Sequence, residues 1–530
     1  MKALIFSFMA ASLLLSSCQK APSKSSQLRI FKTNFIDDPK TFDPRKGSDP
    51  IASTVHFLLY EGLTRFLPDC SVEPALAMSW KISEDGKTYT FTLRHATWSD
   101  GASVTAMDFE DSWKKILSPD FFAPNAHLLY VIKNARAVKR GELPLSELGV
   151  RTLDATTLQV ELEAPTPYFL GLTAFCVLFP AKYTLDETSP SWANSPLQQI
   201  VTSGPFLLKD YQPGKNICFV KNPDYWDANN FHLDGIEISF VRDCNTAMQM
   251  FEQKQLHLIG GFLSPLSQEQ ILLFKNKDEF YSRATASTNV VFFNTARGPL
   301  INTHIRRAIA LAVDRQSIVD HIMHLGQPIA LEVVPLSLKK EQRFFLNDRA
   351  ISQAQEEFQR GLDQLGIDKS VFKTMTLVYF DSPQQKQIAQ TLQNQWKQVL
   401  DIEISIKQVD WSSFLDLLNK RDFDLVQGYY AAQYPDPMNI LERFQYKDSL
   451  KNYCNWENDN FSSLLNQSFT VDEKQRNYLL EEAEKILCDE LPFSPLYHEC
   501  SAFLLQKNLK NFHQTVIGTI CYKDLMIDDE

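Results

Sequence analysis

The spacing of hydrophobic and polar positions predicts a β-rich region in the first part of the chain. Residues 89–93 (YTFTL) alternate with a period of two, and they follow a turn at residues 83–86 (SEDG). With residues 80–82 before the turn, this pattern predicts a β-hairpin. Residues 105–108 (TAMD) fit a capping box ahead of apolar positions at helical spacing, and Pro119 follows, so we expect a helix between them. A further strand is expected at residues 158–162.

From about residue 289 the pattern changes. Apolar positions at helical spacing begin at Ile305 and predict a long amphipathic helix. Later, strands and helices alternate in the order strand 376–380, helix 384–400, strand 402–406, helix 412–419 and strand 423–426. This βαβαβ order predicts a parallel sheet in a second lobe. Ligands bind such sheets outside the carboxyl ends of the strands, so residues 427–437 (QGYYAAQYPDP), which follow the third strand, are expected at a crevice.

Composition indicates a globular protein of more than one domain. A chain of 530 residues is too long for one ordinary core, so two or three domains or lobes are expected. A hydrophobic content of 44% argues against long disordered regions. The net charge of −11 argues against a nucleic-acid partner, because phosphate binding requires a basic surface.

The N-terminal residues are typical of an exported lipoprotein. Residues 1–17 combine an early lysine, a short apolar run and small residues, as a signal peptide does. We expect lipidation of Cys18 and a polar tether over residues 18–27; the alternative is a plain secretory signal with an accidental cysteine. The protein is then expected in the periplasm or at the cell surface, attached to a bacterial membrane only through its lipid.

Catalytic and metal-binding motifs are weak in this sequence. The phosphate-binding loop, the His-Glu-x-x-His motif, the Gly-x-Ser-x-Gly motif and the dinucleotide fingerprint are all absent. His321 and His324 lie three apart but have no obvious third ligand, which favours a surface or partly buried pair over a metal site. The cysteines after Cys18 lack zinc-ligand spacing, and free thiols are favoured slightly over disulfides. We therefore expect neither an enzyme nor a cofactor.

Aromatic and amide side chains, in contrast, are plentiful near the predicted strand ends. Aromatic groups supply contact area in a binding crevice, and amides pair with a ligand backbone. For any single aromatic residue a core position is the simpler interpretation, but as a set they favour a binding protein. The set is Trp411, Tyr429, Tyr430, Gln433, Tyr434, Tyr497 and His498.

Several stretches resemble family 5 extracellular solute-binding proteins. The residues that carry the resemblance are 42–44 (FDP), 59–63 (LYEGL), 75–113, 203–227 and 292–315. Residues 148–169 are similar to the oligopeptide-binding branch in particular. The matches follow the family's order from about residue 28 to the C-terminus.

The resemblance implies a bilobal α/β fold like that of periplasmic binding proteins, with mixed sheets flanked by helices, an extra subdomain and a ligand cleft between the lobes. The implied divisions are residues 28–65, 196–285 and 505–530 for lobe I, 66–195 for its extra subdomain and 286–504 for lobe II. It also implies a monomer that encloses an extended peptide and presents it to the permease of an ABC importer. Backbone pairing with the peptide gives affinity without choice of sequence.

The sequence departs from its peptide-binding relatives at expected contacts. Relatives place an aspartate that meets the peptide α-ammonium where Gln433 stands here. They place arginines at the positions of Leu418 and Gln427, and a histidine at that of Gln385. A relative's disulfide would fall at Ser287 and Ala431, neither of which is cysteine.

Three interpretations of the ligand remain open. The ammonium of a peptide could be met elsewhere, by Asp436 or by Asp38. A peptide could instead bind without fixed termini, through its backbone and the tyrosines. The ligand could also be something other than an ordinary peptide, such as a modified cell-wall peptide, and the family includes nickel, haem and sugar binders. A surface peptidase is a further alternative of a different class, which the missing catalytic constellation disfavours.

Overall fold

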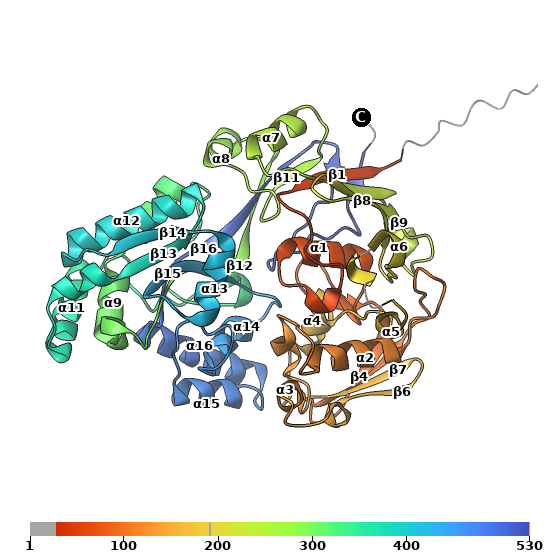
Figure 1. Cartoon of the computed structure of the whole chain (residues 1–530), viewed down its shortest axis with the longest axis horizontal. Helices are drawn as coiled ribbons and strands as arrows, with labels where there is room; N and C mark the ends of the chain where they lie inside the picture. Colours follow the sequence, from red (N-terminus) through yellow and green to blue (C-terminus); the bar gives the residue numbers. More distant parts are fainter. Residues whose placement is uncertain (1–27, 190–191, 195, 529–530) are drawn as a thin grey trace, which may run out of the picture.

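The computed structural model describes residues 28–189, 192–194 and 196–528, and its largest element is a mixed β-sheet of ten strands. Figure 1 shows that the two ends of this sheet lie in two lobes, in agreement with the expected bilobal α/β architecture. In spatial order the strands are β14 (Ser405–Val409), β13 (Thr376–Phe380), β15 (Leu425–Ala431), β12 (Phe280–Phe293), β16 (Phe493–Leu505), β11 (Leu258–Gly260), β1 (Ile30–Phe35), β10 (Gly235–Phe240), β9 (Asn216–Lys221) and β8 (Phe206–Gln212).

Two long antiparallel strands join the lobes. β12 has 14 residues and β16 has 13, which at about 3.3 Å per residue gives each strand a length of roughly 45 Å. One end of β12 pairs with β15 in lobe II, whereas the far end of β16 pairs with β11 in lobe I. Their mutual register shifts between Ala284 and Thr288, where the ladder passes from one lobe to the other.

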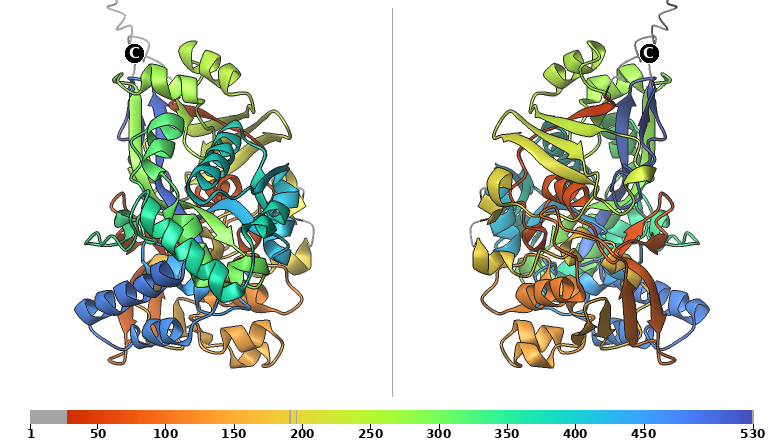
Figure 2. Two further views of the ribbon diagram at one scale, coloured as in Figure 1. Left: turned by 90° about the vertical axis from the view of Figure 1, so that its left-hand side faces the viewer. Right: turned by 90° about the vertical axis from the view of Figure 1, so that its right-hand side faces the viewer.

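Helices cover the sheets of both lobes. In Figure 2, α9, α11 and α12 lie over one face of the lobe II sheet, and their apolar residues share one core with β12, β13 and β15. The helices are α1 (Pro50–Leu59), α2 (Ala106–Leu117), α3 (Ala135–Lys139), α4 (Phe169–Thr173), α5 (Leu185–Thr188), α6 (Pro196–Gln199), α7 (Cys244–Glu252), α8 (Gln268–Phe274), α9 (Thr303–Leu311), α10 (Arg315–Ile318), α11 (Ile351–Leu365), α12 (Pro383–Leu400), α13 (Trp411–Lys420), α14 (Met438–Leu441), α15 (Asp459–Gln467) and α16 (Glu473–Glu490).

The predicted βαβαβ unit is confirmed in lobe II, with two corrections to its strands. β13 pairs in parallel with β14 and with β15, and α12 and α13 are the crossovers. β14 begins at Ser405, not at residue 402, because Ile402 and Ile404 pack into the core before the ladder starts. β15 continues to Ala431, because β12 pairs with it that far. Residues 427–431 therefore belong to the strand and do not follow it.

The long helix expected from Ile305 was wrong: it is broken into shorter pieces. α9 ends at Leu311, and Asp314 starts α10 by accepting a hydrogen bond from the backbone N–H of Ser317. The buried Arg315 guanidinium donates to the carbonyls of Ala310 and Pro495, so side-chain hydrogen bonds replace helical ones here. His324 follows in a left-handed conformation and therefore shares no regular helical face with His321.

The extra subdomain is a four-stranded sheet covered by α2. Its strands run in the order β4 (Ala77–Ile82), β5 (Thr88–Leu93), β7 (Thr157–Glu161) and β6 (Val150–Asp154), all antiparallel. The predicted hairpin is the β4–β5 pair, and β7 matches the strand expected at 158–162. The capping box of Thr105 and Asp108 starts α2 as predicted.

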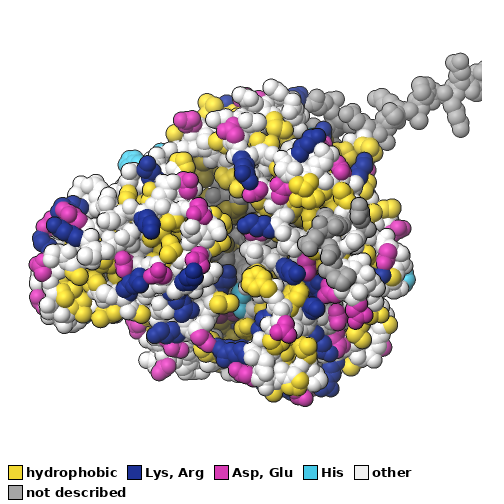
Figure 3. Space-filling view, viewed as in Figure 1, with side chains coloured by type: hydrophobic (Ala, Val, Ile, Leu, Met, Phe, Trp, Pro, Cys, Tyr) yellow, Lys and Arg dark blue, Asp and Glu magenta, His cyan; other side chains and the backbone are white. Residues whose placement is uncertain are grey.

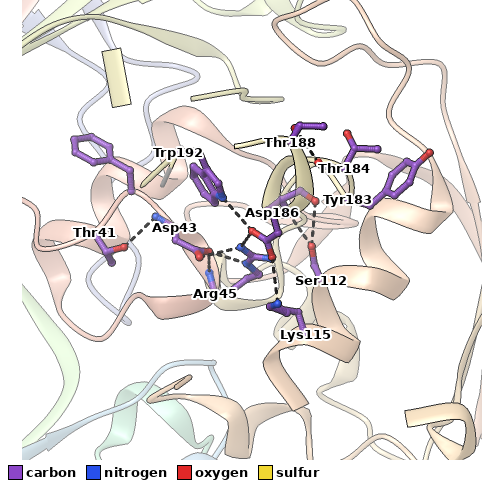
Figure 4. Close-up of polar contacts among 12 residues, drawn as sticks. Thr41, Asp43, Arg45, Ser112, Lys115, Tyr183, Thr184, Asp186, Thr188 and Trp192 are labelled. Atoms are coloured by element: carbon purple, nitrogen blue, oxygen red, sulfur yellow. Dashed lines mark hydrogen bonds and ion pairs between the residues drawn. The ribbon is translucent and has the colours of Figure 1, made fainter. Parts of the chain in front are cut away.

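Arg45 is a buried, charged residue that connects lobe I to α5 (Figure 4). Its guanidinium donates to Asp43 at 2.8 Å and to Asp186 at 2.8 and 2.9 Å. Arg45 and Asp43 are each about 3% exposed in their side chains. Trp192 Nε1 also donates to Asp186, at 3.1 Å. The FDP stretch is therefore a structural element that anchors one segment of lobe I to another.

A second family stretch also has a structural role. Glu61, in the LYEGL stretch, accepts hydrogen bonds from the side chains of Tyr225 and Trp226. Arg65 pairs with Asp227 at 2.6 Å. Glu61, Arg65 and Tyr225 line a partly open cavity of about 100 Å³ in lobe I, whose lining also includes residues 519–524. None of the helices in the described part of the chain has the length and apolar character needed to cross a bilayer.

Candidate ligand-binding site

The chain that leaves β15 forms a contact between the two lobes. Gln433 Nε2 donates to Asn125 Oδ1 of the extra subdomain at 3.1 Å. The ring of Tyr434 stacks on that of Tyr168, with centroids 4.6 Å apart and planes 11° apart. Both tyrosines are buried. The interface between the lobes thus hides an aromatic pair, and offset stacking of this kind adds to the gain from burial.

Asp436 is held inside lobe II by its neighbours. One carboxylate oxygen accepts hydrogen bonds from Arg476 Nη2 at 2.7 Å and from the backbone N–H of Met438 at 2.9 Å. Burial lowers the pKa of Arg476, but the Asp436 charge outweighs burial and the pKa stands above its usual value. These contacts commit Asp436 to Arg476, which leaves it little charge to offer a ligand ammonium.

A second contact between the lobes lies on the surface. Asp448 of lobe II accepts hydrogen bonds from Arg136 and Arg140 of the subdomain, at 3.1 and 2.5 Å. The Arg136 guanidinium also lies over the Tyr446 ring, 4.5 Å from its centroid. These are two of the contacts between the lobes; in a third, Gln268 Nε2 of lobe I donates to the Ile322 carbonyl of lobe II at 3.1 Å. Figure 3 shows the surface hollowed along the boundary between them, with Lys and Arg side chains beside the hollow.

Two of the predicted ligand-binding amides contact each other. Gln427 Nε2 donates to Gln385 Oε1 at 2.5 Å, and both side chains are buried. Gln427 lies within β15, and Gln385 lies in the first turn of α12. The Gln427 Oε1 atom has no hydrogen-bond partner within the described residues. In place of charges, this part of lobe II therefore presents a neutral pair of amides.

Other predicted site residues are packed into the protein or bound within one lobe. Three of them, Tyr430, Tyr497 and His498, are at most 4% exposed. His498 Nδ1 lies 2.9 Å from Thr288 Oγ1. Burial lowers the pKa of His498 to about 3, so it is neutral at pH 7. Asp38 accepts hydrogen bonds from Tyr211 Oη at 3.0 Å and from the backbone N–H of Gly214 at 2.9 Å, both in lobe I.

Two aromatic residues keep exposed faces. Trp411 is 41% exposed and stacks on Phe414 at the start of α13, with centroids 5.4 Å apart. Tyr429 is 40% exposed, yet burial raises its pKa. Both rings therefore leave free surface on lobe II.

Several cleft residues were missed by the sequence analysis. Asn125 and Tyr168 contact the corner from the other lobe, and a distant segment of a single sequence carries no signal of such contacts. Arg443 lies in a short 3-10 helix and Lys451 in a turn, and cations are ordinary in both places. Glu499 had a signal that was overlooked, because it is the one carboxylate in the otherwise uncharged strand β16.

The register of the sheet agrees with the alignment used for Gln433. Ser287 and Ala431, where a relative's disulfide would fall, are direct partners in the β12–β15 ladder. The eight cysteines in the described part of the chain are free, whereas Cys18 lies outside it. Within the described residues, no group of three or more His, Cys, Asp or Glu could hold a metal ion.

Comparison with known proteins shows which family has this sequence pattern. Residues 71–452 match the model of bacterial extracellular solute-binding proteins, family 5. The oligopeptide-binding protein OppA of Bacillus subtilis is 32% identical, with 93% of this chain and 91% of the relative covered. The dipeptide-binding protein DppE of the same organism is 31% identical, with 94% and 92% covered.

The fold is also that of a solved relative. The substrate-binding domain of an oligopeptide ABC transporter from Bacillus anthracis superimposes with a TM-score of 0.82 at 28% identity, covering 95% of this chain and 99% of that one. This confirms the expected periplasmic-binding-protein-like fold. Members of this family bind solutes for transport and are not enzymes. The chain belongs to the family 5 bacterial extracellular solute-binding proteins.

Proposed function

We propose that the protein captures oligopeptides between its two lobes and delivers them to the permease of an ABC importer. The observation that carries this proposal is an unpaired strand edge in the cleft. β12 pairs with β15 as far as Ala431, whereas β13 pairs with β15 only at Leu425 and Val426. Among the described strands, none pairs with the other edge of residues 428–431. An extended peptide can add to such an edge through main-chain hydrogen bonds, whatever its side chains are.

The surroundings of this edge support the same proposal. Tyr429 and Ala431 are exposed on it, and the next residues reach across to the opposite lobe. A ligand held by both lobes favours the closed arrangement. Relatives named for binding oligopeptides and dipeptides share over nine-tenths of the chain. The divisions into lobes and subdomain given above, and a monomeric state, remain predictions.

Mass spectrometry of whatever co-purifies with the protein tests the proposal. The protein is denatured, and the released species are identified. We expect a mixture of short peptides, because recognition through the backbone selects weakly among sequences. One defined non-peptide species would contradict the proposal. Incubation of tetra-alanine with the protein tests the peptidase alternative. We expect the peptide to remain intact over time, whereas a peptidase would cleave it.

We further propose that Cys18 carries the lipid that anchors the protein, with residues 18–27 as the tether. Replacing Cys18 by alanine should move the protein from the membrane fraction to the soluble fraction, because the substitution removes the lipid that we propose as the sole anchor. Fractionation followed by intact-mass measurement checks this expectation. The matched variant Cys70→Ala should stay in the membrane fraction. Membrane association of the Cys18→Ala protein would contradict lipid anchoring.

A further inference from the structure

One end of the cleft carries positive charge without a matching anion. Arg443 is fixed at the end of β15, where Nη2 donates to the Ala431 carbonyl at 2.7 Å and Nε donates to the Asn439 carbonyl at 3.0 Å. Burial lowers the pKa of Arg443, and Glu442 is the carboxylate whose charge acts against this effect. Burial raises the pKa of Glu442 to about 7, so this group is only partly charged at neutral pH.

Lys451 lies beside Arg443 and makes no ion pair or hydrogen bond within the described residues. Burial lowers its pKa to about 8, and the Arg443 charge contributes in the same direction. His127 faces this pair from the opposite lobe, and its pKa is lowered to about 3 by burial and then by Lys451 and Arg443. By solvent exposure Lys451 is half-buried; an unpaired, partly desolvated ammonium is unfavourable, and a ligand anion would supply its missing partner.

A neighbouring amide also lacks an acceptor. Asn439 is 1% exposed, and its Oδ1 accepts hydrogen bonds from the Gln433 backbone and from Arg443 Nη2. Its Nδ2 donor has no partner within the described residues. Hydrogen-bond donors therefore exceed acceptors at this end of the cleft.

Another part of the cleft has the opposite character. Glu499, on β16, accepts a hydrogen bond from Asn289 Nδ2 and lies beside the Tyr497 hydroxyl. Burial raises the Glu499 pKa to about 7, and no described Lys or Arg pairs with this carboxylate. Asn289 is 2% exposed, and its Oδ1 acceptor has no partner within the described residues. Here the acceptors exceed the donors.

Two tyrosines connect these groups. The pKa of Tyr429 is raised by burial, then by Glu499 and by Tyr453. Burial also raises the pKa of Tyr453, which Arg443 lowers in part. Tyr429 is the β12–β15 ladder partner of Asn289, the residue that donates to Glu499, so Tyr429 lies near the acidic group. Tyr429 is exposed and belongs to the segment of β15 whose outer edge no described strand pairs.

We propose that the cleft selects ligands that carry both charges, with an anionic group bound at Arg443 and Lys451 and a cationic group bound at Glu499. For a peptide the carboxylate and the ammonium are the simplest such groups, and acidic and basic side chains are the other source. This inference rests on the proposed function. It adds a polarity to the site, because it assigns the anion to the end of the cleft beside Gln433.

Calorimetric binding of blocked peptides tests the proposal on protein refolded free of its ligand. The probes are tetra-alanine, its C-terminal amide and its N-acetylated form. Amidation should weaken binding to the unaltered protein roughly ten- to hundredfold, as expected when a hydrogen bond to a charged group is lost. In Lys451→Met the same amidation should cost less than about threefold. The exposed neighbour Lys447→Met should behave as the unaltered protein does.

The acidic group is tested in parallel. N-acetylation should weaken binding to the unaltered protein and to Glu252→Gln, an exposed control on α7, but have little effect on Glu499→Gln. Tetra-alanine amide with one aspartate, and N-acetylated tetra-alanine with one lysine, show whether a side chain can supply either charge. Equal losses in the variants and in the unaltered protein, or no loss on blocking, would overturn the inference while leaving peptide binding intact. If none of these peptides binds, the proposed function itself is rejected, and the inference with it.

Discussion

Replacing Arg45 by methionine should lower the free energy of unfolding by about 3–5 kcal/mol, the range for breaking a buried ion pair. The guanidinium makes four hydrogen bonds to Asp43 and Asp186 and is about 3% exposed. Methionine keeps much of the volume but removes the guanidinium from between the two carboxylates, and it leaves Asp186 with the more distant Lys115 at 3.7 Å. Urea unfolding followed by tryptophan fluorescence measures the change, and Trp192 is a direct neighbour.

The matched control is Arg242→Met. Arg242 pairs with Asp37 at 3.0 Å, but its side chain is 80% exposed, so this change should cost less than about 1 kcal/mol. Asp186→Asn should also cost less in the Arg45→Met background than in the unaltered protein, because its partner is already gone. Equal effects of Arg45→Met and Arg242→Met would contradict the assigned role.

The Asp186 contribution has a defined pH range. Burial raises its pKa, but Arg45 outweighs burial and brings the pKa to about 2, from an ordinary 3.8. A lowered carboxylate pKa stabilises the fold at pH values above the unfolded pKa, and the contribution is lost as pH falls through the folded pKa. This corresponds to about 2 kcal/mol, present above pH 3.8 and lost toward pH 2. The Arg45→Met variant should lack most of this acid dependence.

Local patterns predicted much of the fold. The β4–β5 hairpin, α2 and the β13–α12 unit each carry their own turn, cap or periodicity in a few neighbouring residues. The errors arose where distant partners decide. β15 runs to Ala431 because β12 pairs with it, and α9 ends early because the Arg315 side chain takes over backbone carbonyls. Neither partner is visible in the local sequence.

The candidate site was less predictable for the same reason. Position in the sequence predicted a site at the Gln433 corner, but it could not show that Asp436 is already paired with Arg476 or that Tyr434 lies against Tyr168. Among the aromatic residues, only burial separates Tyr429, which has a free face, from Tyr430, which is in the core. The charges of Lys451 and Glu499 gain meaning only once the folded chain shows that neither has a countercharge.

Replacing Tyr434 by alanine should weaken tetra-alanine binding by about 30-fold or more. Tyr434 and Tyr168 come from opposite lobes, and both are buried in their contact. Losing the buried area costs about 1.5–3 kcal/mol, and losing the stacking costs about 0.5–1.5 kcal/mol. Both contributions belong to the closed arrangement, so the closed fraction falls and the apparent affinity falls with it.

Two measurements separate this effect from general damage to lobe II. Small-angle scattering of the ligand-free Tyr434→Ala protein should give a larger radius of gyration than the unaltered protein, because its open fraction is larger. In a double-mutant cycle, Tyr168→Ala should add little binding loss to Tyr434→Ala, since each change removes the same contact. Tyr478→Ala, on the exposed side of α16, should leave affinity and dimensions unchanged. Fully additive losses from Tyr434→Ala and Tyr168→Ala would instead mean that each ring acts within its own lobe, and the contact would not control closure.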